Sequence, residues 1–95
     1  MKAYEVLYII RPDLDEETLA TNVDRFAEIV TNNGGTELSV DKWGKRRLAY
    51  EINDFRDGTY ILMNFNGEAR TVQELERVMK ISDNVLRFLT TRKED

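Results

Sequence analysis

The sequence predicts a single α+β domain whose elements run strand, helix, strand, strand, helix, strand along residues 1–95. Two short segments rich in β-branched and aromatic residues, 4–10 and 59–65, are typical of buried strands. Two other segments, 15–33 and 71–79, repeat apolar residues at helical spacing. A chain of this length has room for one hydrophobic core. We therefore expect a four-stranded antiparallel sheet with both helices on one face, the arrangement called ferredoxin-like.

The first strand is expected over residues 4–10, because Pro12 follows and cannot donate to a ladder of hydrogen bonds. The first helix should begin after Asp15, whose carboxylate can cap its N-terminus. Glu16 and Glu17 follow in the first turn, where the helix dipole favours anions. Gly34 is expected to end this helix in a left-handed conformation. The apolar stripe of the helix is made by Leu19, Val23, Phe26 and Val30.

Residues 36–52 predict one long strand that is bent or bulged at Gly44. A turn is expected over residues 54–58, and a second strongly apolar strand over 59–65. The segment Thr71-Val72-Gln73-Glu74 fits the capping-box pattern and places the start of the second helix at Thr71. The last strand is expected over 85–91, with residues 92–95 as a short frayed tail.

The first and third strands are the most apolar, as expected for the two strands that this fold places at the centre of the sheet. Side chains alternate between the two faces of a sheet. We expect the face covered by the helices to carry Tyr4, Val6, Tyr8, Ile61, Met63, Phe65 and Phe88. We expect the open face to carry Leu7, Ile9, Tyr60, Leu62, Asn64, Arg87 and Leu89. Large apolar side chains on an uncovered sheet indicate a surface for a partner.

The composition argues against catalysis and export. The chain has no Cys and no His, which excludes disulfides, thiolate metal sites and the commonest general base. It has no Gly-rich phosphate loop, and no apolar run approaches the roughly 20 residues of a membrane helix. The N-terminus does not resemble a signal peptide, so the cytoplasm is the expected compartment. We expect no enzyme activity and no cofactor.

A metal site is also not expected. Asp13, Asp15 and Glu17 have the spacing of the first three ligands of a calcium loop. That loop requires a glycine where this chain has Thr18, and the segment leads into a helix. Capping of the helix explains these carboxylates better than metal binding does.

Charge is unevenly distributed along this acidic chain, which has a net charge of −4. Residues 42–47, Lys-Trp-Gly-Lys-Arg-Arg, carry four cations around one aromatic side chain. Lys and Arg neutralise phosphates, and Trp43 could stack on an exposed base. The alternative is a solvated edge strand kept from aggregating by its charges, and for Trp43 we favour packing over stacking. Arg87 would either meet a phosphate on the open face or pair with Glu5.

The segment Gly44-Lys45-Arg46-Arg47-Leu48-Ala49-Tyr50-Glu51-Ile52 resembles the signature of the bacterial small-subunit ribosomal protein six family. Residues similar to that family also stand at 4–6, at 11–12 and at 81–87, and the resemblance covers essentially the whole chain. Two departures stand out. Ala3 occupies a position where many relatives carry a second cation, and Glu51 stands where proline is frequent.

The resemblance implies a structural component of the small ribosomal subunit that binds the central domain of small-subunit ribosomal RNA. It further implies cooperative binding as a heterodimer with the small, basic ribosomal protein eighteen. The residues assigned to RNA contact are Lys2, Lys45, Arg46, Arg47, Arg87 and Arg92. The residues expected to bury against the partner protein are Leu7, Ile9, Tyr60, Leu62 and Leu89.

Two other functions compete with this interpretation. The first is a non-catalytic ferredoxin-like protein–protein interaction module, in which the open sheet pairs or dimerises. The second is a small enzyme of the acylphosphatase kind, which needs a phosphate-cradling loop after the first strand. This chain has Arg11-Pro12-Asp13-Leu14-Asp15 there, and its carboxylates would repel a phosphate.

Overall fold

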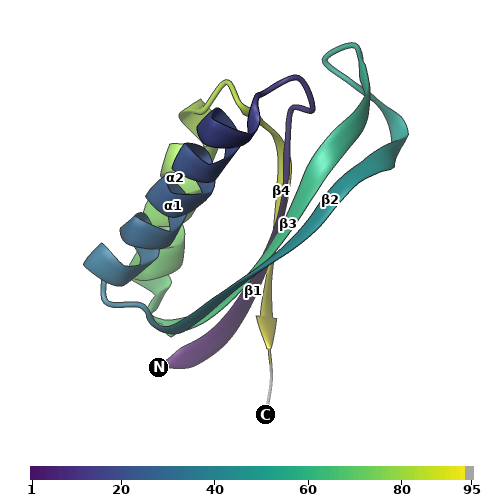
Figure 1. The fold of residues 1–95 in the computed structure, drawn as a ribbon. Helices are drawn as coiled ribbons and strands as arrows, with labels where there is room; N and C mark the ends of the chain where they lie inside the picture. The colour runs from purple at the N-terminus through teal and green to yellow at the C-terminus, as the bar shows by residue number, and fades with distance from the viewer. Residues whose placement is uncertain (94–95) are drawn as a thin grey trace.

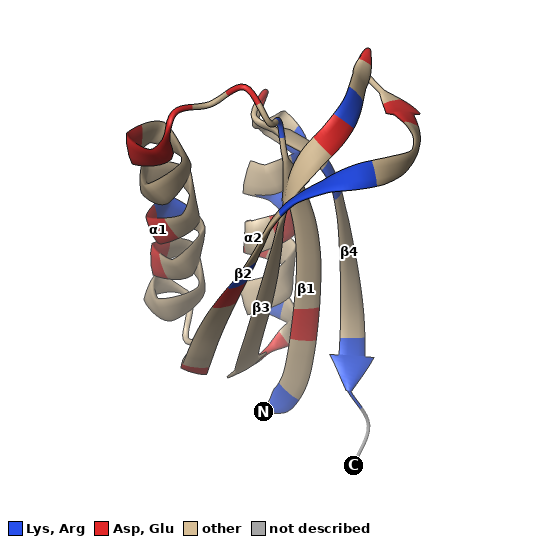
Figure 2. Ribbon diagram, turned by 45° about the vertical axis from the view of Figure 1, so that its right-hand side comes forward, with Lys and Arg blue, Asp and Glu red and all other residues tan. Residues whose placement is uncertain are grey.

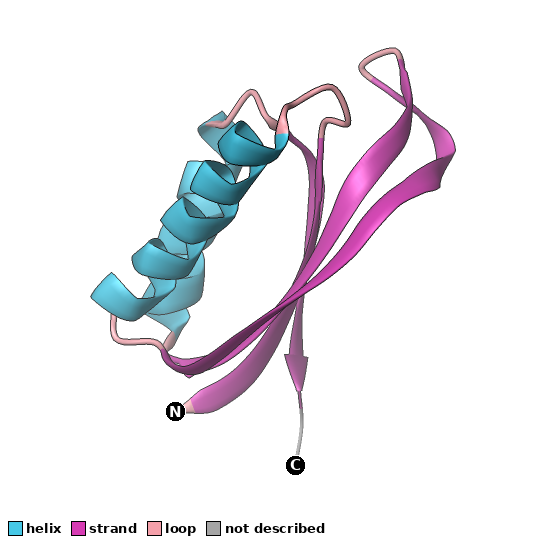
Figure 3. Ribbon diagram, in the orientation of Figure 1, coloured by secondary structure: helices cyan, strands magenta, loops and turns pink. Residues whose placement is uncertain are grey.

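In the computed structural model, which describes residues 1–93, two helices pack on one face of a four-stranded antiparallel sheet (Figures 1 and 3). The strands follow the order β2-β3-β1-β4 across the sheet, so β1 and β3 are central as predicted. The ferredoxin-like fold class is therefore confirmed. The elements are β1 (Lys2–Ile10), α1 (Glu16–Asn32), β2 (Thr36–Ile52), β3 (Phe55–Gly67), α2 (Ala69–Ile81) and β4 (Val85–Lys93).

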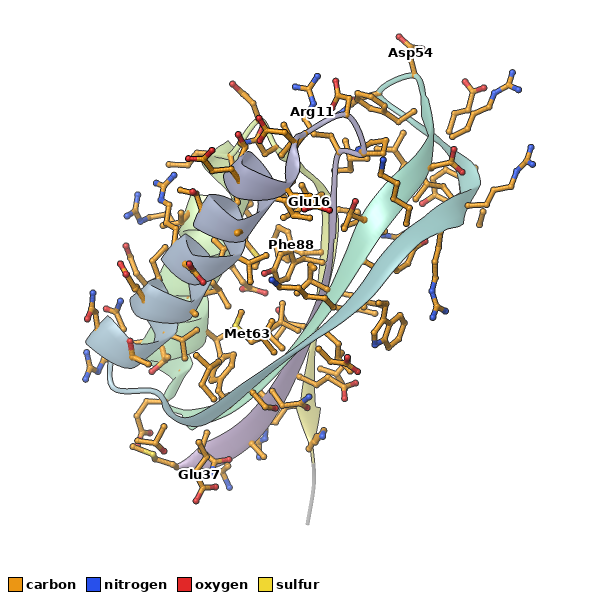
Figure 4. The ribbon with its side chains drawn as sticks, viewed as in Figure 1. Arg11, Glu16, Glu37, Asp54, Met63 and Phe88 are labelled. Atoms are coloured by element: carbon orange, nitrogen blue, oxygen red, sulfur yellow. The ribbon has the colours of Figure 1, made fainter. Side chains whose placement is uncertain are left out.

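The hydrophobic core lies between the helices and the covered face of the sheet. Alternation along the central strands puts the expected residues there, and Met63 and Phe88 point from the sheet toward the helices in Figure 4. Tyr8 meets Phe26 of α1 edge to face, with ring centroids 5.3 Å apart. Tyr4 and Phe88 are partly buried against the same cluster. The fully buried members on the sheet are Val6, Tyr8, Ile10, Ile61, Met63 and Phe65.

Helix α1 begins and ends where the sequence predicts. The Oδ1 atom of Asp15 accepts a hydrogen bond from the backbone N–H of Thr18 at 2.7 Å. Hydrogen bonding to Thr18 also lowers the pKa of the Asp15 carboxyl below its ordinary value. At the other end Gly34 has φ +87°, the left-handed conformation that glycine adopts without strain. The capping residues therefore determine the length of this helix.

Helix α2 begins earlier than the capping-box pattern predicts. Its N-cap is Glu68, and Thr71 lies in the first turn rather than at the cap. The backbone N–H of Glu68 donates to the Thr71 hydroxyl oxygen at 3.2 Å. The Thr71 hydroxyl in turn donates to the carbonyl oxygen of Asn33 at 2.7 Å. The predicted start at Thr71 is wrong because Thr71 is the third residue of the helix, where it accepts from the N-cap residue Glu68. Its hydrogen bond to Asn33 also connects α2 to the end of α1.

Two other boundaries differ from the prediction. The turn between β2 and β3 is the two-residue Asn53-Asp54, with φ values of 50° and 68°, and not residues 54–58. Asparagine and aspartate tolerate the positive φ that a tight hairpin needs, so β3 can start at Phe55. Strand β4 continues to Lys93, so Arg92 and Lys93 are paired with β1 and are not a frayed tail. Residues 94–95 of that expected tail lie outside the described part.

The β2–β3 hairpin extends beyond the rest of the sheet. Strand β1 ends at Ile10, opposite Thr59 of β3, while β2 and β3 stay paired to their common turn. We call residues 45–58 the distal hairpin. Figure 1 shows it leaning away from the helices, toward the open face. The register shifts between Lys42 and Gly44, which confirms the predicted bulge. Within residues 1–93, neither helix is both long and apolar enough to cross a membrane.

Candidate nucleic-acid and partner interface

The open face of the sheet carries an apolar surface. The five residues expected there lie on that face, opposite in parity to the core residues. Leu89 is 57% exposed, whereas Ile9 is buried under the distal hairpin. A shallow hollow of about 180 Å³ lies on this face. It is lined by Leu7, Ile9, Tyr60, Arg87, Phe88 and Leu89. Apolar side chains next to one cation form a surface that a protein segment could cover.

The distal hairpin is held over the open face by close packing at Gly58. A Cβ atom on Gly58 would stand only 2.3 Å from Cγ2 of Ile9 and 3.4 Å from Cδ2 of Leu48. The missing side chain therefore makes room for Ile9 against β3, and Leu48 of β2 is buried beside this contact. This contact positions the basic segment of β2 relative to the open face. The sequence pattern places Gly58 in the turn expected over residues 54–58, and it carries no signal that Ile9 approaches this glycine.

The basic segment of the distal hairpin is divided between its two sides. Arg46 is paired with Gly58, whose missing Cβ would point at Ile9 on the open face. Arg46 therefore lies on the open-face side of the hairpin. Lys45 and Arg47 alternate with it and lie on the other side. The three cations of the signature segment thus do not all address the same surface.

Trp43 packs against the sheet, as we favoured, while 37% of it stays exposed. Its ring is parallel to that of Tyr60, with an interplanar angle of 4° and centroids 6.4 Å apart. The guanidinium carbon of Arg46 lies 4.9 Å from the centroid of the Trp43 ring. The indole Nε1 donates to Oδ2 of Asp41 at 3.2 Å. Trp43 therefore contacts three groups of its own chain and keeps part of its ring exposed.

Arg87 contacts the distal hairpin and not Glu5. Its guanidinium donates a hydrogen bond to the hydroxyl oxygen of Tyr50 and lies 5.9 Å from the centre of that ring. Glu5 lies opposite Thr91, four positions further along β4, and is paired with Lys93 at 3.6 Å. The suggested Arg87–Glu5 pair is therefore wrong. The sequence pattern assigns Tyr50 no contact, and only its alternation with Leu48 places it on the open-face side.

In the part of the chain that the structure describes, no carboxylate neutralises the cations assigned to RNA contact. Within residues 1–93, the ion pairs involve none of Lys2, Lys45, Arg46, Arg47, Arg87 or Arg92. Glu51, at the position where relatives often have proline, is instead paired with Arg56 at 3.0 Å. The added carboxylate therefore neutralises a neighbour and leaves the signature cations free for an anion.

These six cations do not form one patch. Lys45, Arg46, Arg47 and Arg87 lie in or beside the distal hairpin, at one end of the sheet. Lys2 and Arg92 lie at the other end, opposite Gly67 and Tyr4 (Figure 2). Arg87 and Arg92 are five residues apart, about 17 Å along a strand at roughly 3.4 Å per residue. A single ligand that contacts all six would have to span the length of the molecule.

The carboxylates that resemble calcium ligands have other roles. Asp13 accepts two hydrogen bonds from the Arg11 guanidinium, at 2.7 and 2.9 Å, and this interaction lowers the pKa of its carboxyl. Asp15 caps α1. In the described part of the chain, no three acidic side chains are arranged to hold a metal ion. The segment thus stabilises the entry to α1.

Comparison with known proteins agrees with this architecture. The sequence model described as "Ribosomal protein S6" matches residues 3–92. A relative named small ribosomal subunit protein bS6, from Desulfitobacterium hafniense, is 74% identical over 95 residues, covering all of both chains. Its namesake from Heliobacterium modesticaldum is 50% identical over 95 residues, covering all of this chain and 99% of the relative.

A solved structure gives the same result for the fold. The crystal structure of 30S ribosomal protein S6 from Thermotoga maritima superposes with a TM-score of 0.91 at 31% identity. The match covers 97% of this chain and 87% of that one. Sequence and fold agree over nearly the whole length. The chain therefore belongs to the ribosomal protein S6 family.

Proposed function

We propose that this chain binds small-subunit ribosomal RNA, in its central domain, as a structural component of the small ribosomal subunit without catalysis of its own. It does so together with the small, basic ribosomal protein eighteen, which covers the open face of the sheet. The cations of the distal hairpin contact phosphates, and the apolar open face contacts the protein partner. Lys2 and Arg92 form a second, separate contact with RNA at the opposite end of the sheet.

The observation that supports this proposal is the separation of charge in an acidic protein. Four of the six proposed RNA contacts gather at the distal hairpin, and none of them is paired with a carboxylate within residues 1–93. Residues 13–28, which lead into α1 and form most of it, carry six acidic side chains and one arginine (Figure 2). Such a molecule approaches RNA in one orientation, and a basic partner would raise its affinity.

Replacement of Arg46 and Arg47 by alanine tests the RNA contact. We expect weaker binding to a central-domain RNA fragment and a salt dependence whose slope falls by about 2, roughly one per lost phosphate contact. A gel-shift titration at two salt concentrations, with the basic partner present, measures both quantities. The control variant is Arg25→Ala with Arg70→Ala, which removes two exposed charges from the helices. Equal RNA affinity in both double variants would contradict the assignment.

The protein partner is tested separately, on the apolar surface. Leu89→Glu puts a carboxylate on an exposed position of the open face, so we expect loss of cooperative binding with the basic partner and little change in folding. Ile81→Glu is the control, because Ile81 is 67% exposed at the end of α2, away from the open face. If both variants keep cooperative binding, the partner does not cover this face. A stable homodimer in light scattering would instead favour the protein–protein interaction module.

A further inference from the structure

Within the proposed RNA-binding function, we infer that Trp43 is a positioning residue, which holds Arg46 ready for a backbone phosphate and does not itself stack on a base. Aromatic residues in basic segments commonly bind exposed bases by stacking. The contacts of Trp43 argue for a different role. The Trp43 ring packs against Tyr60 of the sheet and is also in contact with the Arg46 guanidinium.

The indole is fixed by its own chain. The backbone at Gly44 has φ +86°, and the register shift at this point places Trp43 beside Tyr60 on the open face. Its Nε1–H is bonded to Asp41 at 3.2 Å. A ring held by a parallel neighbour and a hydrogen bond has little freedom to turn toward an incoming base. It is a fixed platform on the surface of β2.

Arg46 packs on the Trp43 ring and still has hydrogen-bond donors available for a phosphate. Its guanidinium lies 4.9 Å from the ring centroid, which is within the range of a cation–π interaction. When a guanidinium stacks its flat face on a ring, its five N–H donors stay available at its edge. An aromatic ring does not neutralise the charge as a carboxylate would. The arginine is therefore ordered before it binds, and it loses fewer rotamers when a phosphate arrives.

The neighbouring cation supplies a contrast. Arg47 follows directly in the sequence, but it lies on the other side of the hairpin, and no aromatic ring among residues 1–93 is in cation–π contact with it. If ordering by an aromatic ring matters, Arg46 depends on Trp43 and Arg47 does not. This pair of adjacent arginines allows the inference to be tested against a matched control.

The contact itself is tested in the free protein. Trp43 is the single tryptophan of the chain, so intrinsic fluorescence reports on this ring alone. Arg46→Ala should change the emission and make the ring more accessible to acrylamide quenching. Arg47→Ala should leave both unchanged. Equal fluorescence in the two variants would overturn the inference without any use of RNA.

A double-mutant cycle then tests the role in binding. Trp43→Leu keeps apolar bulk against Tyr60 but removes the ring, and we expect it to weaken RNA binding about threefold. Arg46→Ala should weaken it about tenfold, and the double variant should bind no more weakly than Arg46→Ala alone, because the two residues act as a unit. When Trp43→Leu is combined with Arg47→Ala, the loss of RNA affinity should equal the product of the two single losses. If Trp43 stacks on a base, the losses of RNA affinity should multiply in both double variants. That result would overturn the inference.

The conservative variant keeps the test clear if Trp43→Leu is poorly folded. Trp43→Phe retains a ring for Arg46, so its RNA affinity and salt dependence should stay close to those of the wild type. A loss in Trp43→Phe as large as in Arg46→Ala would overturn the inference. Failure of the proposed function looks different. In that case the wild-type protein, shown to be folded, would not bind the RNA with its basic partner, while the fluorescence result on Arg46 would stand.

Discussion

The two faces of the same central strands have nearly the same apolar character and different surroundings. On β1, Val6 and Tyr8 face the helices and are buried, whereas Leu7 between them faces the open side and is half-buried. On β3, Met63 and Leu62 show the same contrast. The helices determine which set forms the core. The apolar residues of the open face thus exceed what the core needs, which favours their use in an interface.

The comparison predicts its largest effect at two neighbouring residues of β3. Met63→Ala should lower the free energy of unfolding by about 2–5 kcal/mol, because it opens a cavity in a fully buried site. Leu62→Ala should cost about 1 kcal/mol, because solvent already reaches that side chain. Urea unfolding measures both. Similar losses in the two variants would mean that the open face contributes to the fold as much as the core does.

A second prediction concerns the contact that places the distal hairpin over the open face. Gly58→Ala should destabilise the protein by about 1–3 kcal/mol, because its Cβ would lie 2.3 Å from Cγ2 of Ile9. In an Ile9→Ala background the same change should be close to neutral, because the clashing atom is gone. Two-state fits to urea unfolding of the four proteins give the coupling.

Gly44→Ala is the matched control for this cycle. Nothing stands within 4 Å of a Cβ at Gly44, so its cost comes only from the positive φ of the backbone. Ile9→Ala should not relieve that cost. If Gly58→Ala costs the same in both backgrounds, close packing of Gly58 against Ile9 does not position the hairpin.

The sequence predicted the fold and both faces of the sheet because these depend on periodic patterns. Alternation in β1 and β3 separates the covered from the open residues, and Asp15 and Gly34 end α1 at the expected places. The family resemblance is confirmed over residues 3–92. It also confirms the expected cytoplasmic compartment, since proteins of the small ribosomal subunit work there.

The errors at α2 and Arg87 share a cause, which is contact between residues far apart in the sequence, whereas the misplaced turn at Asn53-Asp54 is a local error. The hydroxyl of Thr71, in the first turn of α2, donates a hydrogen bond to the carbonyl oxygen of Asn33, 38 positions away. The partner of Arg87 is Tyr50, 37 positions away, and it is reached only because the distal hairpin leans over the sheet. The basic segment could be found by composition. Its division between two sides depends on the bulge at Gly44 and on the register beyond it.

The smallest predicted effect concerns the pH dependence of stability, and it compares Tyr8 on the covered face with Tyr60 on the open face. The hydroxyl of Tyr8, on the covered face, is buried and has no hydrogen-bond partner within residues 1–93. Burial, with a smaller contribution from Asp24, raises the pKa of this phenol above its ordinary value of 10.0. The folded protein therefore keeps the Tyr8 proton at a pH where the unfolded chain loses it. Stability should fall as the pH rises above about 10, by up to about 1.4 kcal/mol per pH unit.

Tyr8→Phe should remove this part of the alkaline loss, and at neutral pH it should be at least as stable as the wild type, because it removes a buried hydroxyl without a partner. Tyr60→Phe on the open face is the control, and it should keep the alkaline loss because Tyr8 is intact. Urea unfolding at pH 7 and between pH 10 and 11.5 measures the slopes. If Tyr8→Phe and the wild type lose stability equally, the Tyr8 hydroxyl reaches water in the folded protein, and the covered face is less tightly closed than its packing indicates.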